Sequence, residues 1–191
     1  MSKKSKLIII SGSSGSGKTT LVNYLMSYPK FNLDFSISAC SRSKRKHEID
    51  GKHYYFISID EFKDKINKDQ FLEWEEVYDN HFYGTLKSKT LEMLSAGKNI
   101  LFDVDVNGGL AIKKYFKEKA LTIFIKAPTL TTARERLIKR KTDSNSAIEF
   151  RVDKIKEEII IGEKMDYQLI NDDLAKSKKK IKILVGEFLD L

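Results

Sequence analysis

The residue pattern with the clearest chemical meaning lies near the N-terminus, where residues 12–19 read Gly-Ser-Ser-Gly-Ser-Gly-Lys-Thr. They fill every fixed position of G-x-x-x-x-G-K-[ST], a loop whose backbone N–H groups surround phosphate oxygens. In this pattern Lys18 is expected to reach the β- and γ-phosphates of a nucleotide, and the Thr19 hydroxyl is expected to face Mg²⁺. The residues of this loop predicted to bind the nucleotide are Gly12, Ser13, Ser14, Gly15, Ser16, Gly17, Lys18, Thr19 and Thr20.

The flanking sequence supports a binding loop over the alternative, a glycine- and serine-rich turn that binds nothing. Residues 6–11 are apolar and mostly β-branched, which is typical of a buried strand. Residues 18–27 have a helical pattern, and the start of a helix adds a partial positive charge that attracts phosphate. A strand, a glycine loop and a helix in this order predict a nucleoside triphosphate site.

Apolar runs alternate with helical patterns along the whole chain. Strands are predicted at 6–11, 35–39, 53–58, 71–78, 99–104, 120–126 and 166–170. Helices are predicted at 18–27, 59–68, 86–96, 107–117, 129–141, 145–164 and 173–189. Ser58 and Glu61 have the spacing of a capping box, and Gly97 lies where a glycine ends a helix. The alternation predicts an α/β protein with three layers, α/β/α, around a parallel central sheet.

Two segments interrupt this alternation. Residues 36–86 have amphipathic strand patterns and a polar stretch, which indicates a small mixed insertion outside the main sheet. Residues 127–157 are helical and rich in arginine and lysine, which suggests a lid that closes over the nucleotide. The predicted core is then built from 1–35, which holds the phosphate loop, and from 87–126 and 158–191.

Composition narrows the class of protein further. The chain has 191 residues with one cysteine, Cys40, so an intramolecular disulfide is impossible and a cytoplasmic location is expected. The apolar run behind the basic N-terminus covers only residues 7–10, too short for a membrane span, so no membrane partner is expected. The net charge of +8 permits a nucleic-acid-binding protein. We expect no nucleic acid partner, however, because the lysines are scattered and the run at 176–182 suits a solvated helix face.

Six pieces, in order, resemble the guanylate kinase family, and the resemblance runs from Leu7 to Phe188. After the phosphate loop come the polar, arginine- and tyrosine-containing stretches of the insertion, Ser36–Arg42 with Arg45, Asp50–Phe56, Phe71–Trp74 and Phe82–Thr85. Phe102-Asp-Val-Asp-Val-Asn-Gly108 resembles the family segment D-[IV]-D-x-[QN]-G, and Ile170-Asn-Asp-Asp173 resembles its late V-N-D-D. The resemblance implies transfer of the γ-phosphate of ATP to GMP, with dGMP as a second acceptor.

The resemblance also implies which residues bind GMP. They are Ser38, Arg42, Arg45, Tyr54, Glu73, Tyr83, Thr85 and Asp103. Guanine presents two donors, N1–H and the 2-amino group, whereas adenine has a bare acceptor at N1, so the carboxylates of Glu73 and Asp103 suit guanine alone. Arginine suits the phosphate of GMP, because its planar fork meets two phosphate oxygens at once.

Family position further implies a catalytic group of Lys18, Arg42, Arg140 and Arg151. Arg140 and Asn171 are expected at the ATP, with Asn171 near the adenine. Arg136 ranks behind the two lid arginines, and Arg134 is expected to face solvent. Mg²⁺ is expected at Thr19, Asp103 and Asp105, since the two aspartates end a buried strand beside the nucleotide.

Several positions depart from the family pattern, and three other functions remain open. The departures are Ser13 in the loop, Ala39-Cys40-Ser41, Lys44, His81-Phe82, and Lys139 with Lys141 in the lid. A ribose-bisphosphate kinase would not need the guanine-reading carboxylates, and a binding module without catalysis would not need Lys18 and Thr19. A basic nucleic-acid-binding protein is favoured by net charge alone. The sequence leaves both a monomer and a homodimer possible.

Overall fold

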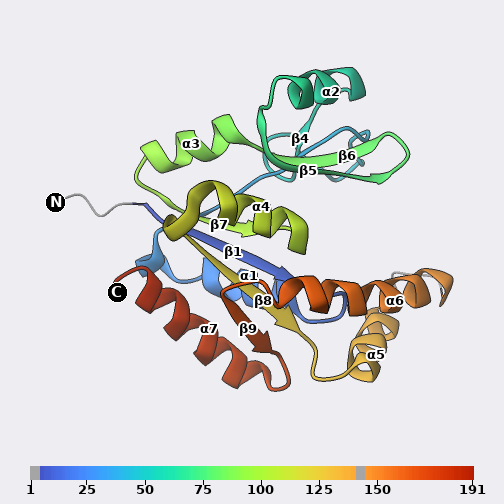
Figure 1. The fold of residues 1–191 in the computed structure, drawn as a ribbon, viewed down its shortest axis with the longest axis vertical. Helices are drawn as coiled ribbons and strands as arrows, with labels where there is room; N and C mark the ends of the chain where they lie inside the picture. The colour runs from blue at the N-terminus through green and yellow to red at the C-terminus, as the bar shows by residue number, and fades with distance from the viewer. Residues whose placement is uncertain (1–4, 141–144) are drawn as a thin grey trace.

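A computed structural model describes residues 5–140 and 145–191. Its central sheet has five strands in the order β2-β7-β1-β8-β9, and every pairing in it is parallel (Figure 1). The strands are β1 (Leu7–Gly12), β2 (Leu33–Phe35), β7 (Asn99–Asp103), β8 (Ala120–Lys126) and β9 (Tyr167–Ile170). The central strands read as continuous apolar runs because helices bury them on both faces.

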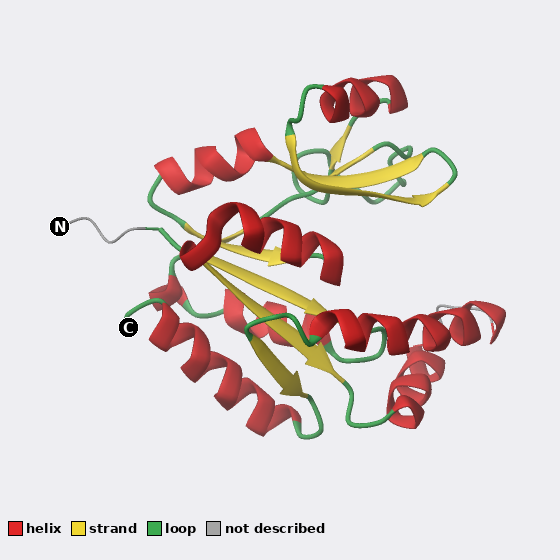
Figure 2. Cartoon of the chain, viewed as in Figure 1, coloured by secondary structure: helices red, strands yellow, loops and turns green. Residues whose placement is uncertain are grey.

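Helices cover both faces of this sheet and so form the predicted three layers (Figure 2). On one face α1 (Lys18–Met26) and α7 (Leu174–Phe188) pack Leu25 and Val185 onto the strands. The other face is covered by α3 (Lys87–Ser95), α4 (Val106–Phe116) and α6 (Asn145–Gly162). The predicted α/β/α fold is therefore confirmed.

A second, four-stranded sheet lies apart from the central one, in the order β4-β3-β6-β5. Its elements are β3 (Ala39–Cys40), β4 (Tyr55–Phe56), α2 (Ile59–Asn67), β5 (Phe71–Tyr78) and β6 (His81–Leu86). The sheet is mixed, because β3 and β4 are parallel while β3–β6 and β5–β6 are antiparallel. It has a small core of its own, in which the Phe62 ring stacks on Phe71 with centroids 4.3 Å apart.

The strand predictions differ from the structure mainly in this region. The predicted strand 35–39 is two strands, since the chain leaves the central sheet at Phe35 and enters the second sheet at Ala39. Strand β6 was not predicted, because its sequence holds Gly84 and several polar residues. Gly84 is paired opposite Trp74, and a Cβ there would lie 2.8 Å from the Glu73 carbonyl oxygen, so the glycine permits close strand contact.

The helix boundaries agree closely with the sequence. The Ser58 hydroxyl accepts from the Glu61 N–H at 3.1 Å, as a capping box requires. Gly97 follows the end of α3 with φ at +75°, a left-handed conformation that glycine adopts without strain. Short 3₁₀ helices occupy Pro29–Phe31 and Lys117–Lys119.

The arginine-rich segment forms two helices that pack on each other, α5 (Leu130–Arg140) and α6. This hairpin lies beside the ends of β1 and β8 from which the phosphate loop and α5 begin (Figure 1). Among the helices described, none is both long and apolar enough to cross a bilayer.

Candidate active site

The phosphate loop connects the end of β1 to the start of α1, as predicted. Gly15 and Gly17 have φ values of +74° and +85°, which side chains with a Cβ rarely adopt. A Cβ at Gly15 would also collide with the carbonyl oxygen of Ala133. The loop borders a cavity of about 270 Å³, lined by residues 12–19 together with Asp105, Arg151 and Glu158. The backbone thus forms an open cradle of the kind that binds phosphate.

Two side chains hold this loop in place through hydrogen bonds to backbone carbonyl oxygens. Asn171 is only 4% exposed, and its Nδ2 donates to the carbonyl oxygen of Ser16 at 2.8 Å. Arg136 donates to the carbonyl oxygens of Asn171 and Gly15 at 2.9 and 3.4 Å. The predicted contact of Asn171 with adenine stays a prediction, whereas this support of the loop was not foreseen for either residue.

The two aspartates lie at the carboxyl end of the central sheet, next to the loop. Asp103 ends β7, in register with Ile10 of β1, and its carboxylate forms an ion pair with the Lys18 ammonium. Asp105 caps α4 by accepting from the N–H groups of Asn107 and Gly108 at 2.8 and 3.0 Å. Both carboxylates therefore border the place where ATP phosphates would lie.

The oxygen atoms of this edge fit a magnesium ion. Thr19 is exposed at the start of α1, and Asp103 and Asp105 supply carboxylate oxygens. Mg²⁺ prefers such oxygen donors and keeps part of its water shell, binding through one or two carboxylates plus substrate phosphates. A site with few protein ligands therefore suits this metal.

A second cavity of about 160 Å³ separates the second sheet from the turn after β7. Its lining includes five of the eight predicted GMP residues, namely Ser38, Tyr54, Glu73, Tyr83 and Asp103. Thr85, a sixth, is buried behind the cavity and donates its hydroxyl proton to Glu73 Oε1 at 2.5 Å. The predicted guanine-binding residues are thus brought together from β3, β5, β6 and β7 and the loops beside them.

Glu73 has an unusual protonation equilibrium in this cavity. Burial raises the pKa of its carboxyl to about 7, and the charges of Asp105 and Glu75 act in the same direction. The hydrogen bond from Thr85 acts against them. A carboxyl with its pKa shifted by burial and neighbouring charge inside a cleft is typical of a functional site.

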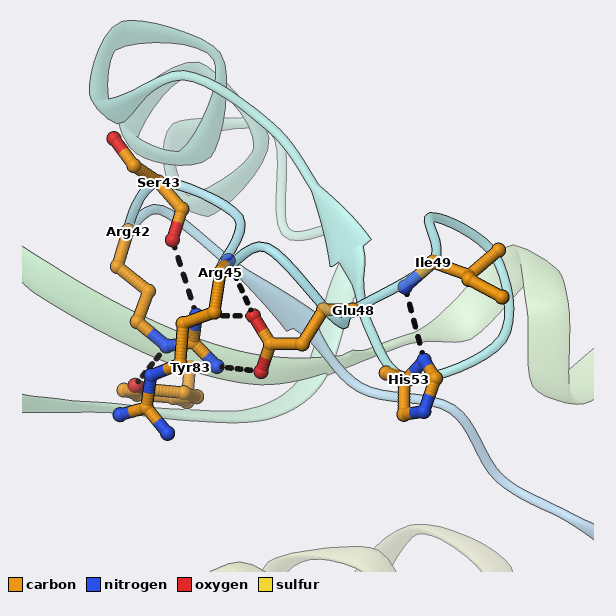
Figure 3. A network of polar contacts seen from close by, with 7 residues as sticks. All are labelled: Arg42, Ser43, Arg45, Glu48, Ile49, His53 and Tyr83. Carbon is orange, nitrogen blue, oxygen red and sulfur yellow. Dashed lines mark hydrogen bonds and ion pairs between the residues drawn. The ribbon is translucent and has the colours of Figure 1, made fainter.

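The predicted phosphate clamp is organised by a residue that the sequence reasoning missed, Glu48 (Figure 3). The Arg42 guanidinium donates to both carboxylate oxygens of Glu48 at 2.6 and 2.7 Å, and its Nε donates to the Tyr83 hydroxyl at 3.0 Å. The guanidinium also lies 5.1 Å from the centre of the Tyr54 ring. Arg42 is thereby held beside the two tyrosines expected to share the GMP phosphate.

Glu48 is 7% exposed and also accepts from the backbone N–H of Arg45 at 2.8 Å. The bonds to Glu48 raise the pKa of Arg42, and the same guanidinium lowers the pKa of Glu48 to about 2. The Arg45 side chain itself is exposed and accessible to a ligand. The sequence did offer a signal for Glu48, because it is the first acidic residue after the basic run at 42–47.

The arginines of the predicted lid differ in their surroundings. Arg151, on α6, lines the phosphate-loop cavity. Arg134, expected to face solvent, is exposed and forms an ion pair across the hairpin with Glu149 at 2.5 Å. Arg140 is the last residue of α5, and its side chain lies outside the described part of the structure.

Comparison with known proteins identifies the family. The guanylate kinase family model matches residues 4–187 of the chain. The chain belongs to the guanylate kinase family. It is 48% identical over 188 residues to a guanylate kinase of Bacteroides fragilis, covering 98% of this chain and 92% of that protein. It is 46% identical over 184 residues to one of Porphyromonas gingivalis, covering 96% and 98%.

A solved structure shows the same fold at lower identity. The crystal structure of guanylate kinase from Anaplasma phagocytophilum superposes with a TM-score of 0.73 at 24% sequence identity. The match covers 97% of this chain and 86% of that one. The two-sheet architecture is therefore that of a guanylate kinase.

Proposed function

We propose that this chain transfers the γ-phosphate of ATP to GMP, giving ADP and GDP, in the two cavities described above. One observation carries the proposal. Asp105 lines both cavities, and the Lys18–Asp103 ion pair joins the phosphate loop to the wall of the second cavity. A donor phosphate on the loop and an acceptor phosphate at the Arg42 clamp would then face each other across these charges, as phosphoryl transfer requires.

On the acceptor side, Glu73 and Asp103 accept hydrogen bonds from the guanine edge, and Ser38 and Thr85 lie near the base. Arg42, Arg45, Tyr54 and Tyr83 hold the GMP phosphate. Glu48 fixes Arg42 through two hydrogen bonds and Arg42 Nε donates to the Tyr83 hydroxyl, so Arg42 offers the phosphate a positive charge held in a fixed position beside the two tyrosines. dGMP serves as a second acceptor, since the proposed contacts are to base and phosphate.

On the donor side, the loop amides and Lys18 bind the ATP phosphates. Thr19, Asp103 and Asp105 would hold Mg²⁺, which would neutralise charge on the phosphate oxygens. Arg151 and Arg140 of the lid stabilise charge that develops on the transferring group, and closure of residues 127–157 excludes water. We propose residues 36–86 as the GMP-binding unit. The cytoplasmic location remains a prediction.

A coupled assay tests this function directly. With ATP as donor, we expect turnover with GMP and dGMP and little with AMP, CMP or UMP, because only guanine satisfies two carboxylate acceptors. Activity on a phosphorylated ribose in preference to GMP would support the ribose-bisphosphate kinase. Nucleotide binding without turnover would support the catalytically inactive module.

Replacing Glu73 by glutamine tests the reading of guanine. The change keeps the shape but places an amide near the guanine donors, so kcat/KM for GMP is expected to fall about ten- to hundredfold. Steady-state kinetics with GMP and IMP, which lacks the 2-amino group, measure this. Glu76→Gln on the same strand is the matched control, since Glu76 is exposed and its contact with the Asn80 N–H survives in the amide. Equal GMP use by both variants would contradict the assignment.

The pH dependence of GMP binding follows from the raised pKa of Glu73. Its carboxyl is charged above about pH 7 and neutral below it, and the charged form is the stronger acceptor for a guanine donor. The KM for GMP is therefore expected to rise as pH falls through 7, while Glu73→Gln loses this step. A KM profile that is flat between about pH 6 and 8 in the unmodified protein would contradict the role of Glu73.

A further inference from the structure

One acidic side chain in the phosphate-loop cavity has no place in the mechanism above. Glu158 lies on α6 and lines this cavity together with the loop residues. Its Oε2 is buried and has no hydrogen-bond partner among the described residues. A carboxylate directed at a loop built to bind anions requires an explanation, because ATP phosphates would bring further negative charge to the same place.

The groups that face Glu158 come from four elements. The backbone N–H of Ser14 in the loop, Lys18 of α1 and Lys154 of α6 itself favour its charged form. Burial has the largest influence and raises the pKa of the Glu158 carboxyl, and the charge of Asp105, in the turn after β7, acts in the same direction. Glu158 thus interacts with the same loop amide and lysine that are expected to bind phosphate.

Lys18, the cation of the loop, also interacts with a carboxylate of the protein. The Lys18 ammonium forms its ion pair with Asp103. Two carboxylates of the protein therefore lie at the groups expected to bind phosphate, since Asp103 pairs with Lys18 and Glu158 lines the cavity of the loop. Phosphate binding is then an exchange of one set of anions for another.

We propose that Glu158 is an internal competitor for the phosphate loop, which weakens the binding of ATP and ADP and must withdraw when their phosphates bind. The proposal rests on the proposed function, since it takes ATP to bind at this loop. Arg151 lies two helical turns before Glu158 on α6 and lines the same cavity.

Such a competitor weakens the binding of the nucleotide in the ground state as well as in the transition state. Its removal should tighten ATP and ADP alike, so KM for ATP falls while kcat does not rise. Weaker binding of ADP benefits turnover, because product release limits many enzymes with lids. A merely structural role for Glu158 would not tighten nucleotide binding.

The test compares Glu158→Gln with Glu157→Gln. The two variants lose the same charge from adjacent positions of α6, but Glu157 is exposed and does not line the cavity. Isothermal titration with ADP, at about pH 8 to keep the carboxyls ionised, measures Kd with Mg²⁺ and with EDTA. We expect Glu158→Gln to bind ADP about tenfold more tightly in both buffers, and Glu157→Gln to bind like the unmodified protein. The Kd of GMP should be the same in all three proteins.

Two results would overturn the proposal. ADP affinity equal in Glu158→Gln and Glu157→Gln would show that Glu158 does not compete. Weaker binding, with or without Mg²⁺, would show that Glu158 helps to hold the nucleotide. If Glu158→Gln does not fold, the same ADP titration is made with Glu158→Ala, and its Kd is judged by the same two criteria. Absence of ADP binding by the unmodified protein would instead reject the proposed function itself, so the two failures are distinguishable.

Discussion

Replacing Lys18 by alanine is expected to lower kcat/KM by about a thousandfold or more, the largest effect of any single change proposed for this protein. Lys18 is the cation of the phosphate loop, and its ammonium already pairs with Asp103 at the junction of the two cavities. Removal takes away positive charge where the transferring phosphoryl group develops negative charge. A coupled assay with ATP and GMP measures the loss.

The control must separate catalysis from folding, because Asp103 loses its ion-pair partner in Lys18→Ala. Thermal unfolding followed by circular dichroism should show a folded variant. Lys176→Ala on the exposed side of α7 should retain full activity. Lys18→Arg keeps the charge but not the geometry of the ammonium, and it should also be strongly impaired. Substantial turnover by a folded Lys18→Ala protein would reject the phosphate-loop assignment.

Replacing Arg151 by alanine is expected to lower kcat about a hundred- to thousandfold while changing the Kd of GMP by less than about threefold. Arg151 lines the cavity of the phosphate loop, so its guanidinium can stabilise charge on the transferring oxygens when the lid closes. Because that charge develops mainly in the transition state, the loss should appear in kcat. Arg140→Ala is expected to act in the same way.

Arg134→Ala is the matched control for the lid. Arg134 lies on the same hairpin, is exposed and pairs with Glu149 on α6. Exposed pairs of this kind contribute at most about 1 kcal/mol to stability, so Arg134→Ala should retain near-normal kcat. A fall in kcat as large as that of Arg151→Ala would mean that hairpin packing, and not a charge at the phosphate, explains the loss.

Much of the fold could be predicted from local sequence because its signals are local. The glycine pattern of residues 12–19, the 3.6-residue periodicity of the helices and the apolar runs of β1 and β8 each depend on near neighbours in the chain. The helix predictions agree with the structure to within about two residues, which is the usual uncertainty of helix ends. Strands β3 and β4 of the second sheet are only two residues long, so they carry too little pattern to be placed in advance.

The sequence predicted which residues would belong to the site. Their hydrogen-bond and ion-pair partners depend on the tertiary structure. Arg42 and Tyr83 are 41 residues apart and meet at 3.0 Å only because β3 and β6 pair. Asn171 was predicted near the adenine and Arg136 as a lesser lid arginine, and the structure shows in addition that both hold the loop through its carbonyl oxygens and each other. No local pattern specifies such contacts, because they depend on where distant segments pack.

The phosphate loop and the α/β layering follow from the sequence alone, and so does the set of side chains expected to recognise GMP. Which carboxylates these cations face depends on how the chain packs. Glu48 is buried against Arg42, and Glu158 directs a buried oxygen into the cavity of the phosphate loop. In the sequence alone, both look like ordinary surface residues. Burial and neighbouring charge alter how a carboxylate behaves, and both are properties of the packed chain.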